Sequence, residues 1–114
     1  MIYGYVNIRK EAINQEKILE TYSGVLKECG VEKIIVETDG NMLQDLLDCL
    51  MPGDSVHVIA MAHLARSTAR LLEISHYFQK NNISLYERNQ QVNWNMILIA
   101  NEIAQRPYMY LNEE

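Results

Sequence analysis

A short apolar segment in the middle of the chain constrains the fold more than any other feature. Residues 56–61 follow the turn Pro52-Gly53-Asp54 and are apolar except for a single histidine. A run of this kind predicts a strand that is buried on both faces of a parallel sheet. His63 and Arg66 come directly after this segment, at the carboxyl end of the strand, where open α/β sheets bind ligands. Ser67 or Thr68 is then expected to cap a helix over residues 68–80.

Strand-like and helix-like segments alternate along the rest of the chain. The pattern predicts further strands over residues 1–8, 31–37 and 83–86, a polar loop over 87–92, and helices over 13–28, 42–50 and 93–105. Pro107 should end the last helix. We therefore expect an α/β fold, a three-layer α/β/α domain with a mainly parallel four-stranded sheet. Residues 1–114 should form one domain.

The charge balance and the cysteines exclude several classes of function. Ten Lys and Arg stand against fifteen Asp and Glu, which gives a net charge of −5. This predicts weak or no autonomous DNA binding, because DNA affinity depends on cations that neutralise phosphates. No apolar run approaches the ~20 residues that span a bilayer, and the first residues lack the basic start of a signal peptide. Cys29 and Cys49 are expected to be free thiols in a reducing compartment, so we predict a cytoplasmic protein without a metal or a cofactor.

The central segment also carries a family resemblance. Residues 61–66, Met-Ala-His-Leu-Ala-Arg, resemble the Leu-Asp-Arg-Leu-(Gly/Ala)-Arg signature of the serine recombinase catalytic domain, the resolvase and invertase family. Residues 1–6, 29–34 and the turn at 52–54 are also similar to that family, so the resemblance covers roughly residues 1–89. It implies a resolvase-like catalytic-domain fold and site-specific DNA recombination without a metal. In this family a serine after the first strand attacks the scissile phosphate, and arginines stabilise the charge that develops.

The chain departs from the family at the residues that would carry this chemistry. Arg9 stands where the resemblance implies the serine nucleophile, and Asn7 stands at a nearby arginine position. Ala62 and His63 replace an aspartate and an arginine, and only Arg66 of the charged set is retained. The resemblance therefore predicts a degenerate, catalytically inactive site. Arg9, His63 and Arg66 stay candidates for binding an anion. A solvated loop residue explains Arg9 better and a neutral histidine explains His63 better, whereas an ion pair explains Arg66 about equally well.

Other side chains could replace the missing nucleophile in principle. Ser67 is one candidate, although a helix cap explains it better. Tyr3 and Tyr5 are others, but Asn7 leaves no cation beside them to activate a phenol.

The last predicted helix suggests how the domain could act without catalysis. In the resembling family this helix makes the dimer contact and leads to a DNA-binding domain, and no such domain is expected in this sequence. Its apolar residues cover more than one face, so a partner should bind some of them. The candidates for this interface are Trp94, Met96, Leu98 and Ile99.

The sequence thus predicts an interaction or regulatory module that forms a homodimer or a heteromer with a related recombinase. Two alternatives stay open. One is an active recombinase with an atypical site. The other is an unrelated flavodoxin-like or receiver-like module, which would lack the usual acidic cluster and the glycine-rich phosphate loop.

Overall fold

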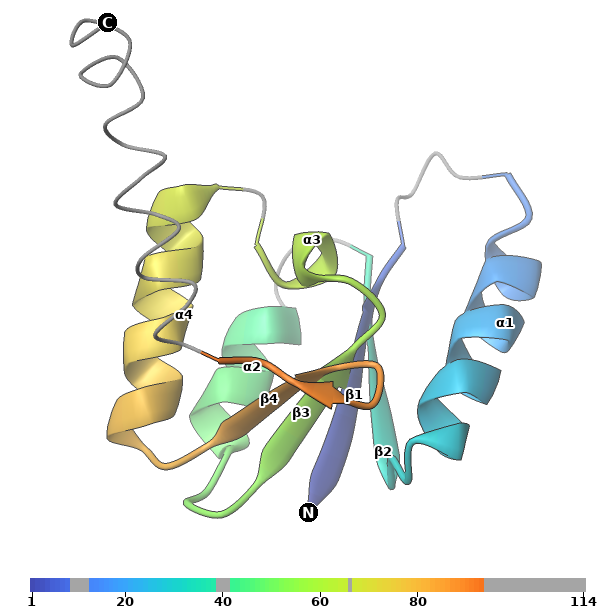
Figure 1. Cartoon of the computed structure of the whole chain (residues 1–114). Helices are drawn as coiled ribbons and strands as arrows, with labels where there is room; N and C mark the ends of the chain where they lie inside the picture. Colours follow the sequence, from blue (N-terminus) through green and yellow to red (C-terminus); the bar gives the residue numbers. More distant parts are fainter. Residues whose placement is uncertain (9–12, 39–41, 66, 94–114) are drawn as a thin grey trace, which may run out of the picture.

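A five-stranded, mostly parallel sheet forms the centre of the molecule (Figure 1). The computed structural model describes residues 1–8, 13–38, 42–65 and 67–93. The strand order is β2-β1-β3-β4-β5. The parallel strands are β1 (Ile2–Asn7), β2 (Lys33–Glu37), β3 (Ser55–Val58) and β4 (Ser84–Glu87), and β5 (Gln90–Gln91) runs antiparallel to β4.

Helices cover both faces of the sheet, which confirms the predicted α/β fold class (Figure 1). One face packs on α1 (Gln15–Glu28), and the other packs on α2 (Met42–Cys49) and α4 (Thr68–Lys80). A short helix, α3 (Met61–Leu64), follows β3. Within the described ranges, no helix is long and apolar enough to cross a membrane.

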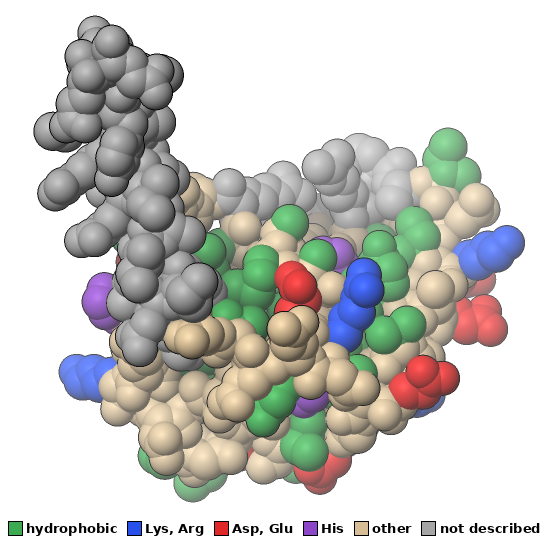
Figure 2. Space-filling model, viewed as in Figure 1, with side chains coloured by type: hydrophobic (Ala, Val, Ile, Leu, Met, Phe, Trp, Pro, Cys, Tyr) green, Lys and Arg blue, Asp and Glu red, His purple; other side chains and the backbone are tan. Residues whose placement is uncertain are grey.

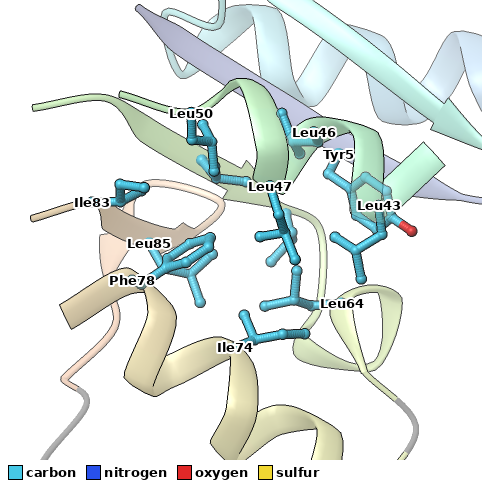
Figure 3. Packing of buried hydrophobic residues seen from close by; sticks show 12 residues of the cluster. Tyr5, Leu43, Leu46, Leu47, Leu50, Leu64, Ile74, Phe78, Ile83 and Leu85 are labelled. Atoms are coloured by element: carbon cyan, nitrogen blue, oxygen red, sulfur yellow. The ribbon is translucent and has the colours of Figure 1, made fainter. Parts of the chain in front are cut away.

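The alternation of side chains along the strands divides the core into two clusters. Tyr5 and Val6 are neighbours on β1 and point into different clusters, one on each face of the sheet. Figure 3 shows the larger cluster between β1, β3, β4, α2 and α4. It includes Leu43, Leu46, Leu47, Val56, Val58, Ile74, Phe78 and Leu85.

Two local predictions were wrong. The strand expected over residues 56–61 ends at Val58. Met61, expected to be the last residue of that strand, instead begins α3, and its backbone N–H donates to the carboxylate of Glu87. The polar loop expected over 87–92 contains β5, which makes the sheet five-stranded instead of four-stranded. The helix expected over 93–105 lies outside the described residues except for Asn93, as do Trp94, Met96, Leu98 and Ile99.

Candidate functional site

The carboxyl edge of the parallel sheet brings together two residues that the sequence analysis selected. Asn7 ends β1, and His63 lies on α3 directly after β3. Because β1 and β3 are parallel neighbours, their carboxyl ends meet at the same edge. The backbone N–H of Asn7 donates a hydrogen bond to Nδ1 of His63 at 3.2 Å. The two positions where the family resemblance implies arginines are therefore in direct contact.

This hydrogen bond determines which ring nitrogen of a neutral His63 carries the proton. Since Nδ1 accepts a hydrogen bond, a neutral ring must carry its proton on Nε2. Burial also lowers the pKa of His63 from its ordinary value of 6.5, because desolvation disfavours the charged form. His63 is thus a neutral hydrogen-bond donor through Nε2 at neutral pH, and not a cation.

The ring of Tyr22 packs against the same histidine. Tyr22 on α1 and His63 have ring centroids 5.3 Å apart in an edge-to-face arrangement. Tyr22 also lines a groove of about 320 Å³ at the start of α1, together with Ile13, Lys17, Ile18 and Thr21. Asn14 completes the lining, so this groove beside Tyr22 mixes apolar side chains with polar ones and one lysine.

On the other side of β1, a buried carboxylate occupies the carboxyl edge. Glu37 ends β2 and is only 2% exposed. Its Oε1 accepts hydrogen bonds from the hydroxyl of Tyr5 at 3.1 Å and from the backbone N–H of Leu43, in the first turn of α2, at 2.9 Å. Figure 3 shows the hydroxyl of Tyr5 at the border of the apolar cluster, beside Leu43. This contact links β1, β2 and α2.

Tyr5 is unsuited to be a nucleophile. Its pKa is strongly raised, first by burial and then by the charge of Glu37 and the hydrogen bond to it. Its side chain is 1% exposed. Tyr5 therefore stays a neutral hydrogen-bond donor inside the core.

The β4–β5 hairpin places an arginine at this edge. The backbone N–H of Arg88 donates to the carbonyl of Val58 at 2.7 Å, and its carbonyl accepts from Nδ1 of His57 at 2.6 Å. These bonds hold Arg88 at a positive φ of 55°, a region that non-glycine residues adopt rarely. The His57 ring also stacks on Tyr86, with centroids 4.5 Å apart. The side chain of Arg88 is exposed.

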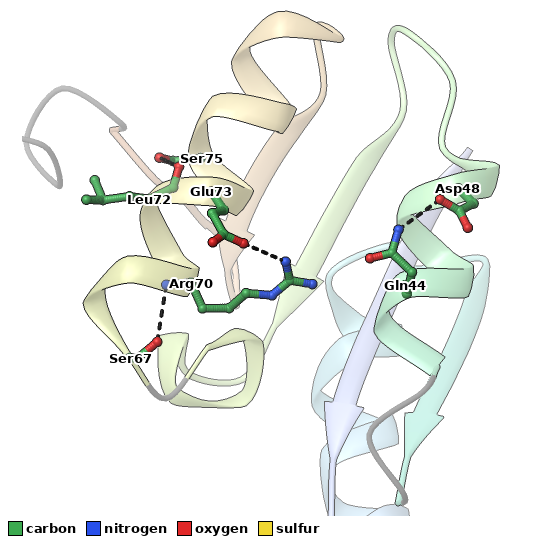
Figure 4. A network of polar contacts seen from close by, with 7 residues as sticks. All are labelled: Gln44, Asp48, Ser67, Arg70, Leu72, Glu73 and Ser75. Carbon is green, nitrogen blue, oxygen red and sulfur yellow. Dashed lines mark hydrogen bonds and ion pairs between the residues drawn. The ribbon is translucent and has the colours of Figure 1, made fainter.

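The remaining predicted site residues divide into three groups. Ala62 is exposed on α3, next to His63. Ser67 is the N-cap of α4, and its hydroxyl oxygen accepts from the backbone N–H of Arg70 at 3.2 Å (Figure 4). Arg9 and Arg66 lie outside the described residues.

Two further features concern possible metal ligands and the two cysteines. Among the residues that the structure describes, no cluster of His, Cys, Asp and Glu could hold a metal ion. Cys29 and Cys49 are free.

Sequence reasoning missed Glu37 and Arg88. Glu37 is an acidic residue at the end of a β-rich segment, which on its own indicates only a solvated strand end. Its position before a turn and a helix was the available signal, because carboxylates favour helix N-termini. Arg88 lies in a segment that was expected to be a polar loop, and its anchoring depends on β3, far away in the sequence.

No protein-family model matches the chain. The chain is 27% identical over 90 residues to the Transposon Tn917 resolvase of Enterococcus faecalis, and the match covers 74% of this chain and 47% of that protein. The domain is resolvase-like. This distant similarity agrees with the resemblance seen in the sequence, and the chain spans about half the length of the resolvase that it matches.

Proposed function

We propose that this resolvase-like domain has lost DNA strand cleavage and acts as an interaction or regulatory module. The observation that carries the proposal is the contact between Asn7 and His63. The family resemblance implies an arginine at each position, and the chain has the uncharged side chain of Asn7 and the neutral imidazole of His63 there. The backbone N–H of Asn7 donates to Nδ1 of His63 and keeps the two positions adjacent.

Phosphoryl transfer depends on cations because charge develops on the phosphoryl oxygens. Removing one group that stabilises such charge typically costs about 10²–10³ in rate. Two positions without charge, together with Arg9 in place of the serine nucleophile, argue against catalysis. None of the three substitute nucleophiles changes this: Tyr5 is buried, desolvation raises the pKa of Tyr3, and the oxygen of Ser67 caps α4.

The alternative of an unrelated flavodoxin-like module is less well supported. The order β2-β1-β3-β4 is shared with flavodoxin-like sheets, so strand order alone does not separate the two. The similarity to a resolvase favours the resolvase-like interpretation.

The proposed mode of action is association through residues 93–105. A homodimer is the default, and pairing with a related active recombinase is the alternative with the larger consequence, because an inactive partner would block its assembly. Trp94, Met96, Leu98 and Ile99 are the proposed contact residues.

A covalent-adduct assay tests the loss of cleavage. The protein is incubated with supercoiled plasmid and with end-labelled duplex DNA, and denaturing gels are searched for a strand linked to protein. We expect no adduct from the wild type or from Arg9→Ser, since the second variant restores the serine without the cations. An active resolvase with its own recombination site serves as the positive control. A 5′-linked product from the wild-type protein would overturn the proposal.

A further inference from the structure

Arg88 combines a strained backbone with an exposed charge. It is the first residue of the two-residue turn between β4 and β5, since Glu87 pairs with Gln90 across the hairpin. Its φ of 55° lies in a region that glycine adopts freely and that other residues adopt only at a cost. Such strain concentrates at functional positions. A glycine would fit this turn with less strain, so folding alone does not explain the arginine.

Two hydrogen bonds and a stacked ring hold this turn in place. The backbone N–H of Arg88 donates to the carbonyl of Val58 at 2.7 Å, and Nδ1 of His57 donates to the Arg88 carbonyl at 2.6 Å. His57 is 5% exposed and stacks on Tyr86, with the ring planes 5° apart. The turn is therefore fixed against the buried end of β3, and the Arg88 side chain starts from a defined position.

The guanidinium of Arg88 has no carboxylate partner within the described ranges. The side chain is exposed, and the two ion pairs found in this part of the chain involve other residues. The carboxylate of the neighbouring Glu87 accepts from the backbone N–H of Met61. Arginine is enriched at protein interfaces, where its planar fork binds carboxylates through two hydrogen bonds. Arg88 is thus an anchored cation available to a partner.

The segment that follows the hairpin contains a complementary charge. The backbone N–H of Val92 bonds back to β4 at 2.8 Å, so the hairpin leads directly into residues 93–105. Glu102 is the only charged residue in the sequence of this segment. In the helix that the sequence predicts there, Glu102 follows Leu98 by four residues and Ile99 by three. It therefore shares a face with these proposed contact residues.

We propose that Arg88 is an interface residue that binds the carboxylate of Glu102 from a second copy of this chain. In a C2 dimer this contact occurs twice, once from each subunit. The chain has a net charge of −5, so two copies repel each other, and a cation at the interface offsets part of this repulsion. The inference rests on the proposed function, because it assumes association through residues 93–105.

Charge reversal tests the pair and separates a contact between subunits from one within a chain. Homodimers of Arg88→Glu and of Glu102→Arg each place like charges opposite one another twice. Each variant should therefore have a dimer Kd at least about 100-fold higher than the wild type. In an equimolar mixture, both contacts of the heterodimer join opposite charges again, so the Kd should return to within about tenfold of the wild type. Analytical ultracentrifugation of each variant and of the mixture measures these values.

Lys80→Glu is the matched control for Arg88→Glu. Lys80 is exposed in the last turn of α4, before β4 begins, whereas Arg88 follows the end of β4. Both substitutions change the net charge by the same amount. Because charges outside the interface are screened at physiological salt, Lys80→Glu should leave the dimer Kd within about threefold of the wild type.

Arg88→Gly separates binding from folding. Glycine relieves the strain of the turn, so the melting temperature should rise by about 4 °C or more at protein concentrations far below the dimer Kd. The same variant removes both interface contacts, so the dimer Kd should rise about tenfold. A purely structural residue would not move stability and association in opposite directions.

The proposal is overturned if Arg88→Glu weakens the dimer no more than Lys80→Glu, or if the two charge-reversed chains do not dimerise when mixed. It is also overturned if Arg88→Gly leaves the dimer Kd unchanged. These outcomes leave the association of the wild type intact, so they differ from a failure of the proposed function. A wild type that stays monomeric removes the homodimer and this contact with it, and a DNA adduct overturns the loss of cleavage.

Discussion

The backbone N–H of Asn7 donates to Nδ1 of His63 at 3.2 Å, and this bond joins the end of β1 to the helical turn after β3. Nδ1 accepts this bond, and Nδ1 is also the nitrogen that would have to take up a second proton if His63 became a cation. Protonation would place two N–H groups against each other. The structure and the desolvation of the ring therefore act in the same direction, towards a neutral histidine.

The first prediction concerns the pH dependence of stability. Because the folded-state pKa of His63 lies below its ordinary value of 6.5, the unfolded state binds more protons over the range between the two values. The contribution of the neutral ring should be fully present above about pH 6.5 and should be lost as the pH falls towards the lower, folded-state pKa. Denaturant unfolding of the wild type and His63→Gln from pH 8 to pH 5 measures this loss, and we expect it only in the wild type.

His76 offers the control for this experiment. It is an exposed histidine on α4. His76→Gln should keep the pH dependence of the wild type. An NMR titration in which the His63 ring carries its proton on Nδ1 at pH 7.5 would contradict the assigned hydrogen bond.

A pair of glycines tests how closely α1 packs on the sheet. A Cβ atom at Gly4 would lie 3.0 Å from Leu26 Cδ1 and 3.0 Å from Val31 Cγ1, whereas nothing lies within 4 Å of a Cβ atom at Gly24 on α1. We expect Gly4→Ala to lower the free energy of unfolding by about 1–3 kcal/mol through overpacking. Gly24→Ala should raise it by about 0.5–1 kcal/mol, because alanine favours a helix interior. Equal effects of the two substitutions in denaturant unfolding would refute this packing.

Local signals explain what the sequence could predict. The helix Thr68–Lys80 was expected at those residues, since Ser67 gives a capping signal and Asn81 follows the last turn. The end of β3 was misplaced because α3 begins where Met61 donates to Glu87, a residue of a later strand. The same holds for Glu37, whose partners Tyr5 and Leu43 meet only after β1 and β2 have paired. Contacts between distant segments determine these features, and no local pattern encodes them.

The cap of α4 gives a third stability prediction. The hydroxyl oxygen of Ser67 accepts from the backbone N–H of Arg70, one of the first-turn donors that have no intrahelical acceptor (Figure 4). We expect Ser67→Ala to lower the free energy of unfolding by about 1 kcal/mol. The neighbouring Thr68→Ala should change it by less than about 0.5 kcal/mol, because Thr68 is exposed and is not the cap. If thermal unfolding showed a larger loss of stability for Thr68→Ala than for Ser67→Ala, Thr68 and not Ser67 would be the cap.

Weak DNA binding follows from the charge of the domain. The net charge is −5, and on the face seen in Figure 2 the described Lys and Arg side chains are separated from one another, without a continuous basic patch. Non-specific DNA binders reach a Kd of about 10⁻⁴–10⁻⁶ M at physiological salt. We expect binding of random duplex weaker than this range in a fluorescence-anisotropy titration at that salt. Low-micromolar binding would contradict the prediction.

The last prediction concerns association through residues 93–105. Introducing a charge into an apolar interface should abolish binding, because the charge would be buried without a partner. Leu98→Glu should therefore convert a dimer into a monomer with unchanged far-UV circular dichroism. Gln105→Glu introduces the same charge at a polar position of this segment and should leave the dimer intact. Light scattering over a range of concentrations measures both variants. A wild type that stays monomeric at high concentration removes the homodimer, and loss of helical signal in Leu98→Glu would show that Leu98 belongs to the core of the domain.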